Sequence, residues 1–112
     1  MKVTLKVSER IWLLGLLPKE GDLLTQRVIH ALREKLGISD EDWKLYDIQP
    51  IPEIQGAIKW DTKKDVGVEY EFGDKTVEII AQSLQEIDKQ KKVTEDFLIL
   101  FDKFIPAEKV SL

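Results

Sequence analysis

The spacing of apolar residues changes sharply close to Gly73. Before it, apolar side chains stand at every second position, which is the period of a half-buried β-strand: Val66, Val68, Tyr70 and Phe72. After it, they recur at helical spacing between residues 75 and 92: Val77, Ile80, Ala81, Leu84 and Ile87. Gly73 permits a sharp turn and Asp74 is the predicted helix cap. Since strand and helix each have one apolar face, we expect the helix to lie across the sheet.

The N-terminal third predicts one strand followed by helices. Apolar residues alternate from 2 to 7, and Ser8 is the predicted N-cap of a helix over 9–16 that is apolar nearly all round. A second helix begins near Asp22 or Thr25, with Thr25 the preferred cap, and ends at 36 before Gly37. Its expected inner face is Leu24, Val28, Ala31, Leu32 and Leu36, with Ile29 at the margin. Ser39 and Asp42 have the spacing of a capping box for a short helix that ends by 46.

The middle of the chain predicts two further strands, at 45–51 and 55–60, and a polar turn at 61–65. With 66–72 they form an expected three-stranded meander, to which the N-terminal strand is a candidate fourth member. Thr94 caps a last helix with an inner stripe of Phe97, Leu100, Phe101, Phe104 and Ile105, and Pro106 ends it. The predicted fold is therefore α+β: a small, mostly antiparallel sheet of three to four strands packed with about five helices. We expect a single domain over 1–105 and a flexible tail at 106–112.

Composition narrows the function classes. The chain has 112 residues, 43% of them hydrophobic and 34% charged, which is typical of one soluble globular domain. Its net charge of −4 makes general nucleic-acid binding unlikely, because displacing counterions from phosphates needs a positive surface. The absence of cysteine excludes disulfides and thiolate chemistry, and it favours a cytoplasmic location. The apolar run at 11–17 is shorter than the roughly 20 residues that span a bilayer, so no membrane segment is predicted.

No residue pattern indicates catalysis or a bound cofactor. His30 is the only histidine, and helical spacing places it beside Gln26, Arg33 and Glu34, away from the apolar stripe. The acidic residues Asp40, Glu41, Asp42 and Asp47 lack the alternate spacing and central glycine of a calcium loop, so cap and helix-dipole interactions explain them better. Nucleotide-binding glycine motifs are also absent. We therefore expect no enzyme, no metal, no cofactor and no evident small-molecule ligand.

Surplus apolar residues point instead to protein contacts. Ile79 and Ile99 stand off the apolar stripes of their helices, and Trp60 ends a predicted strand. Either another helix of the same chain covers these residues, or they belong to a subunit or partner interface. Cover by the same chain is the preferred interpretation for each single residue, while for the chain as a whole we expect self-association or a protein partner. The alternative function is a nucleic-acid-associated regulator that uses Lys89, Lys91, Lys92 and the lysine-rich turn at 59–64.

Several short motifs resemble those of small bacteriophage or prophage proteins. They are Ser8-Glu9-Arg10, LPKEG at 17–21, Thr25, LREKL at 32–36 and the closing Lys103-Phe104. Such proteins have no assigned activity, so the resemblance implies a phage-type origin, action in the host cytoplasm and no residue roles. The function expected from the sequence is a non-catalytic interaction or accessory module.

Overall fold

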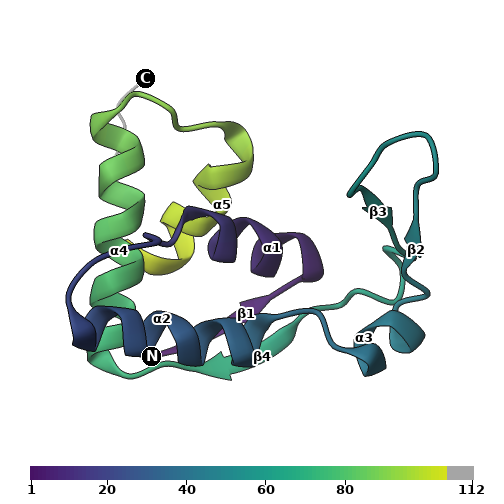
Figure 1. Ribbon diagram of the computed structural model, residues 1–112, viewed down its shortest axis with the longest axis horizontal. Helices are drawn as coiled ribbons and strands as arrows, with labels where there is room; N and C mark the ends of the chain where they lie inside the picture. Colours follow the sequence, from purple (N-terminus) through teal and green to yellow (C-terminus); the bar gives the residue numbers. More distant parts are fainter. Residues whose placement is uncertain (106–112) are drawn as a thin grey trace.

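A computed structural model of the chain describes residues 1–105, and Figure 1 shows the arrangement of its elements. In chain order they are β1 (Lys2–Leu5), α1 (Val7–Leu16), α2 (Leu23–Leu36), α3 (Asp40–Leu45), β2 (Gln49–Pro50), β3 (Ile58–Lys59), β4 (Val68–Glu71), α4 (Asp74–Lys89) and α5 (Glu95–Phe104). The fold is α+β, as the sequence predicted. The predicted helix end at Pro106 and the predicted tail lie outside the described residues.

The strands form two separate two-stranded antiparallel sheets, β1 with β4 and β2 with β3. The expected single sheet of three to four strands is therefore wrong. Both outer edges of the β1–β4 pair carry a lysine: Lys103 Nζ donates to the Thr4 carbonyl at 2.6 Å, and Lys35 Nζ donates to the Glu71 carbonyl at 2.8 Å. Ammonium groups on edge carbonyls oppose further strand pairing, which is a reason why this sheet stops at two strands.

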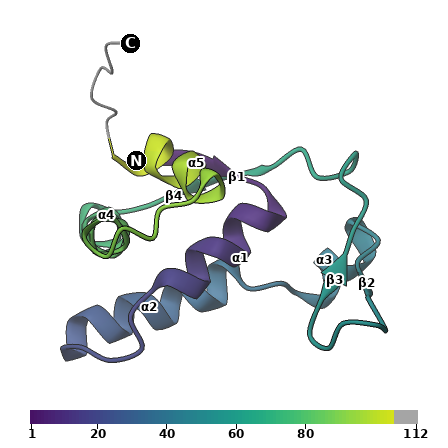
Figure 2. The same cartoon turned by 90° about the horizontal axis from the view of Figure 1, so that it is seen from above.

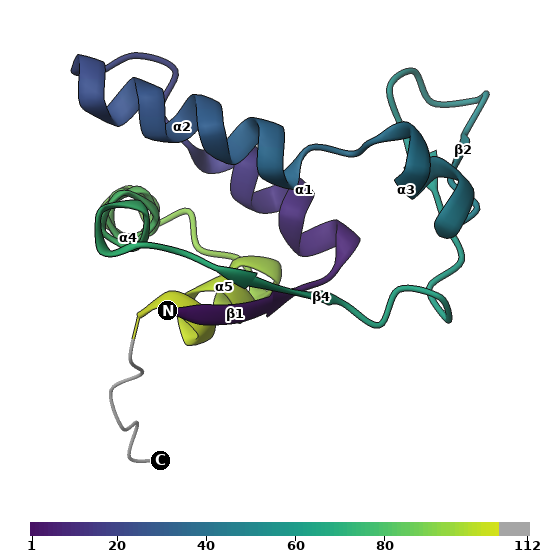
Figure 3. The same cartoon turned by 90° about the horizontal axis from the view of Figure 1, so that it is seen from below.

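The main core lies between the β1–β4 pair and the helices. Figure 3 shows α1 and α2 on one side of the two strands and α5 close beside them. The residues with no exposed surface come from five elements: Leu5, Leu13, Leu36, Ile80, Leu84 and Leu100. Each such side chain stabilises the fold by about 1.5–3 kcal/mol relative to an exposed position. Phe72 joins this core, with its ring centroid 6.0 Å from that of Tyr70 and 6.2 Å from that of Phe104.

Residues 38–65, which we call the arm, pack around a second, smaller hydrophobic cluster. The arm contains α3, β2 and β3, and Figures 1 and 2 place it on the side of the molecule opposite α4. Val7, Tyr46 and Ile48 are the buried residues of the cluster, and Ile38, Ile58 and Trp60 pack against them. The arm is therefore attached to the N-terminal end of α1 through Val7.

The change of period at Gly73 predicted the strand and helix pair only in part. Phe72, Ile80 and Leu84 are buried as expected, but Val66 is 79% exposed and Val68 is 40% exposed. Strand alternation determines which side chains share a face of the sheet, but not whether other elements cover that face. Here the covering residues reach Phe72 but do not extend to Val68 and Val66. The α4 helix ends at Lys89 rather than 92, and its N-cap is Gly73, so Asp74 is not the cap.

Two further helix starts and one helix face differ from the prediction. The first helix begins at Val7 with Lys6 as N-cap, so Ser8 is not its cap. In α2 the cap is Asp22, whose Oδ1 accepts the Thr25 N–H at 2.8 Å and whose pKa is lowered by that bond; the preference for Thr25 was wrong. The buried face of α2 is Ile29, Leu32 and Leu36, whereas Leu24 and Ala31 are exposed. The capping box of Ser39 and Asp42 and the inner stripe of α5 lie as predicted.

Candidate functional site

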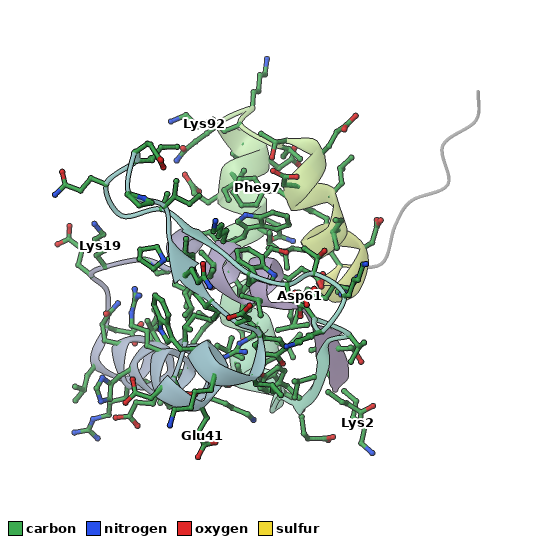
Figure 4. The ribbon with its side chains drawn as sticks, turned by 90° about the vertical axis from the view of Figure 1, so that its right-hand side faces the viewer. Lys2, Lys19, Glu41, Asp61, Lys92 and Phe97 are labelled. Atoms are coloured by element: carbon green, nitrogen blue, oxygen red, sulfur yellow. The ribbon has the colours of Figure 1, made fainter. Side chains whose placement is uncertain are left out.

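An apolar groove lies between α1, α4 and the start of α5. Its cavity volume is about 700 Å³, which is within the range of protein ligand sites. The apolar lining consists of Ile11, Trp12, Gly15, Leu16, Pro18, Ile79, Ile87 and Phe97. In Figure 4 Phe97 lies against α4, with Lys92 beyond it at the end of that helix.

Two helices with more apolar surface than the core uses produce this groove. In α1, Leu13 and Leu17 are buried in the core, while Ile11 and Trp12 remain partly exposed on the other side. In α4, Ile80 and Leu84 reach the core, and the neighbouring row of Ile79 and Ile87 lines the groove. Figure 1 shows α4 upright beside the C-terminal end of α1, which runs roughly across it, so the two helices do not cover each other along their lengths.

The polar groups of the groove are mostly engaged within their own helix. Ser83 Oγ donates to the Ile79 carbonyl at 2.9 Å, and Gln90 Nε2 donates to Glu86 Oε1 at 3.2 Å. Thr25 and Gln82 complete the polar lining, in which Glu86 is the only ionisable side chain. The lining thus combines a mostly apolar surface with one carboxylate.

The structure separates the three residues that the sequence offered as interface candidates. Ile79 is only 3% exposed and lies at the base of the groove, so other elements of the same chain cover most of it, which is the first of the two alternatives. Trp60 is half-buried on the arm, where its Nε1–H donates to Asp65 Oδ2 at 3.2 Å. Ile99 is 43% exposed on α5 and remains available for a contact. These three residues do not form one surface.

Sequence reasoning missed the buried charges, of which Arg10 is the most connected. It is 4% exposed, and its Nε donates to the Leu36 carbonyl at 3.0 Å. Its Nη2 donates to the Gly37 carbonyl and to Asp42 Oδ2, each at 2.9 Å. Partial burial alone would raise the pKa of Asp42, but bonds from the Ser39 N–H and from Arg10 outweigh it and lower that pKa. Arg10 thus ties α1 to the end of α2 and to the start of the arm.

Glu9 and Asp65 are the other buried charges, and both are hydrogen-bonded. Lys103 Nζ donates to both Glu9 carboxylate oxygens, at 2.8 and 2.7 Å, which joins α5 to α1. Both oxygens of Asp65 accept the Val7 N–H, at 3.2 and 3.1 Å, at the first turn of α1. Within the described part of the chain no buried side-chain nitrogen or oxygen lacks a partner. These groups therefore serve the fold.

The remaining candidates occupy ordinary surface positions. His30 is exposed on α2, with Nε2 3.2 Å from Glu34 Oε1. Asp42 belongs to the capping box, whereas Asp40, Glu41 and Asp47 are exposed. No group of three potential metal ligands occurs among residues 1–105. No helix in that range is both long and apolar enough to cross a membrane.

The two lysine-rich stretches lie apart. Lys89, Lys91 and Lys92 are at the C-terminal end of α4, while the turn at 59–64 follows β3 on the arm. Figures 1 and 2 show these two regions on opposite sides of the molecule. They do not combine into one basic patch.

Comparison with known proteins gives no relative: no protein-family model, curated protein or solved structure matches the chain. The groove is consequently the main lead to function. The sequence contained one sign of it, the surplus of apolar residues on α1 and at Ile79, but not the geometry that brings them together.

Proposed function

We propose that the chain is a non-catalytic protein-interaction module, of the accessory kind that bacteriophages and prophages encode, acting in the host cytoplasm. The docking surface is the groove between α1, α4 and α5. The observation that carries the proposal is an apolar lining that includes the aromatic residues Trp12 and Phe97 around a volume of about 700 Å³.

Such a lining favours a protein partner for two reasons. Partly exposed apolar surface is poorly hydrated, so covering it stabilises a complex by about 25 cal/mol per Å² of apolar area. Aromatic side chains in a concave site are typical anchors of protein interfaces. Two polar groups of the lining, Ser83 and Gln90, hydrogen-bond to neighbouring residues of the same segment, which leaves the lining mostly apolar.

The nucleic-acid alternative receives less support. It needs a continuous positive surface, and the two lysine-rich stretches lie on opposite sides of the molecule. The interaction module is therefore the better supported of the two functions.

The test compares two variants that each add one leucine. Gly15 lines the groove, and a Cβ built on it meets no atom within 4 Å, so Gly15→Leu introduces a large side chain at the groove from an uncrowded backbone position. Gln85→Leu adds the same side chain at an exposed position of α4 outside the groove. Light scattering measures self-association, and pull-down from a bacterial host lysate measures partner capture.

The wild type and Gln85→Leu are expected to self-associate or to capture the same specific protein, and Gly15→Leu is expected to lose that contact. If all three chains are strict monomers that capture the same set of proteins, the groove is not a docking surface.

A further inference from the structure

We propose that the occupant of the groove is an amphipathic helix of another protein, with lysine or arginine along the border of its apolar face. This inference rests on the docking role proposed above and adds the shape and charge of the partner.

The walls of the groove favour a helix over an extended segment. They are themselves helical: α1 on one side, α4 on the other, and the first turns of α5 at one end. Helical walls use their backbone N–H and C=O groups internally, so they offer a docked strand almost no backbone partners. A helix satisfies its own backbone groups and presents only side chains to the walls.

The length of the groove fits the same occupant. Its lining on α4 runs from Ile79 to Gln90, which at the helical rise of 1.5 Å per residue is about 16 Å. That distance corresponds to about three helical turns. A docked helix would therefore place apolar anchors at positions i, i+3 or i+4, and i+7 over the groove.

The one charged residue within the lining of the groove favours a cationic partner. Glu86 is the only charged residue of the lining, and no salt bridge pairs it with a cation of residues 1–105. The C-terminal end of α1 also borders the groove, through Gly15 and Leu16. Its last turn contains no basic residue, so the negative end of the helix dipole is not offset there by a charge of α1. Both features attract lysine or arginine.

The α5 helix of a second copy of this chain fits less well. The exposed apolar residues on its α5 are Leu98 and Ile99, and the exposed neighbours of these residues on the helix are Glu95, Asp96 and Asp102. Inserting that face into the groove of another copy would bring carboxylates towards Glu86. Juxtaposed like charges oppose association, and the net charge of −4 on each copy adds to the repulsion.

Three synthetic peptides of one length test the proposal against the full chain. Each is a 15-residue amphipathic helix with leucine at i, i+4, i+7 and i+11, and the other positions are helix-forming residues plus either lysine, glutamine or glutamate. Fluorescence anisotropy of the labelled peptides at about 0.15 M salt gives the dissociation constants. We expect the lysine peptide to bind at least tenfold more tightly than the glutamate peptide.

Three variants locate the binding and test its charge preference. Gly15→Leu, which fills the groove, should weaken binding of the lysine peptide at least tenfold. Glu86→Lys should remove or reverse the preference for lysine over glutamate. Asp88→Lys makes the same charge change on α4 outside the lining, so it should keep the preference. Circular dichroism establishes that each variant is folded.

The outcomes separate this inference from the proposed function. If the glutamine or glutamate peptide binds as tightly as the lysine peptide and Gly15→Leu weakens both, the docking groove stands and the cationic partner is wrong. If no peptide has an affinity that depends on Gly15, while Gly15→Leu still abolishes self-association, the occupant is a second copy. If neither measurement depends on Gly15, both the inference and the docking role fail.

Discussion

Replacing Arg10 by methionine tests whether a buried guanidinium holds three parts of the fold together. Its donors reach the Leu36 carbonyl, the Gly37 carbonyl and Asp42 from α1, at 2.9 to 3.0 Å. Methionine keeps most of the apolar stem of the arginine but donates no hydrogen bond. The variant therefore keeps the three acceptors but removes the guanidinium that donates hydrogen bonds to them.

The magnitude follows from the burial of these acceptors. Because Leu36 is fully buried, leaving its carbonyl without a donor lowers the free energy of unfolding by about 1–3 kcal/mol. The Asp42 side chain is 18% exposed and recovers part of its lost bond from water. Removing one partner of a buried ion pair commonly costs about 3–5 kcal/mol, and with this partial recovery we expect a loss of about 3 kcal/mol in the free energy of unfolding.

Urea unfolding at neutral pH, followed by tryptophan fluorescence, measures that free energy. Arg33→Met is the matched control, because Arg33 is exposed on α2 and the same charge is removed. We expect the control to change stability by less than about 0.5 kcal/mol. Equal losses in the two variants, or a loss below about 1 kcal/mol for Arg10→Met, would contradict the bracing role of Arg10.

Three further predictions concern single positions. Gly15→Ala should raise the free energy of unfolding by about 0.5–1 kcal/mol in a urea titration, because alanine favours a helix interior and its Cβ meets no atom within 4 Å; a loss of stability would show that this site is crowded. Asp65→Ala should lower it by about 2–3 kcal/mol and move the emission of Trp60 to longer wavelength, because the Val7 N–H and the indole N–H both lose their acceptor. The pKa of Asp42 lies below its ordinary value of 3.8, so its contribution is present above that pH and is lost as the pH falls through the folded-state pKa. Acid titration of stability should therefore show a smaller loss in Asp42→Asn than in the wild type, and equal losses would contradict the shift.

Local sequence patterns correctly predicted the features that involve residues close together in the chain. Helical spacing identified Ile80 and Leu84 as core residues, and the capping box at Ser39 was readable because its partner Asp42 is three residues away. The inner stripe of α5 was predictable for the same reason. In each case the deciding contacts lie within one or two turns of helix.

Contacts between distant segments decided the rest. The first helix begins at Val7 and not after Ser8, and the acceptor at its first turn is Asp65, 58 positions away in sequence. Local spacing offers Glu9 and Arg10 no partner, and Lys103 and Asp42 come from 94 and 32 positions away to pair with them. No pattern of period two or 3.6 contains such information.

The groove was unpredictable for a related reason. Helical spacing assigned Ile79 to the outside of its helix, because the stripe of Ile80 and Leu84 was the stronger one. Only the angle at which α4 crosses α1 shows that the row of Ile79 and Ile87 faces Trp12 across an open space. The sequence therefore showed a surplus of apolar residues without showing where they meet.

The most direct test of the docking groove uses the three tryptophans, which the structure places in different settings. Trp12 lines the groove, Trp43 is on α3, and Trp60 packs on the arm. With 5-fluorotryptophan incorporated, ¹⁹F NMR resolves one resonance for each of them in an otherwise unchanged chain. On addition of the lysine peptide, we expect the Trp12 resonance to shift while those of Trp43 and Trp60 stay in place. A shift at Trp43 or Trp60 with Trp12 unmoved would place the binding surface on the arm and would contradict docking in the groove.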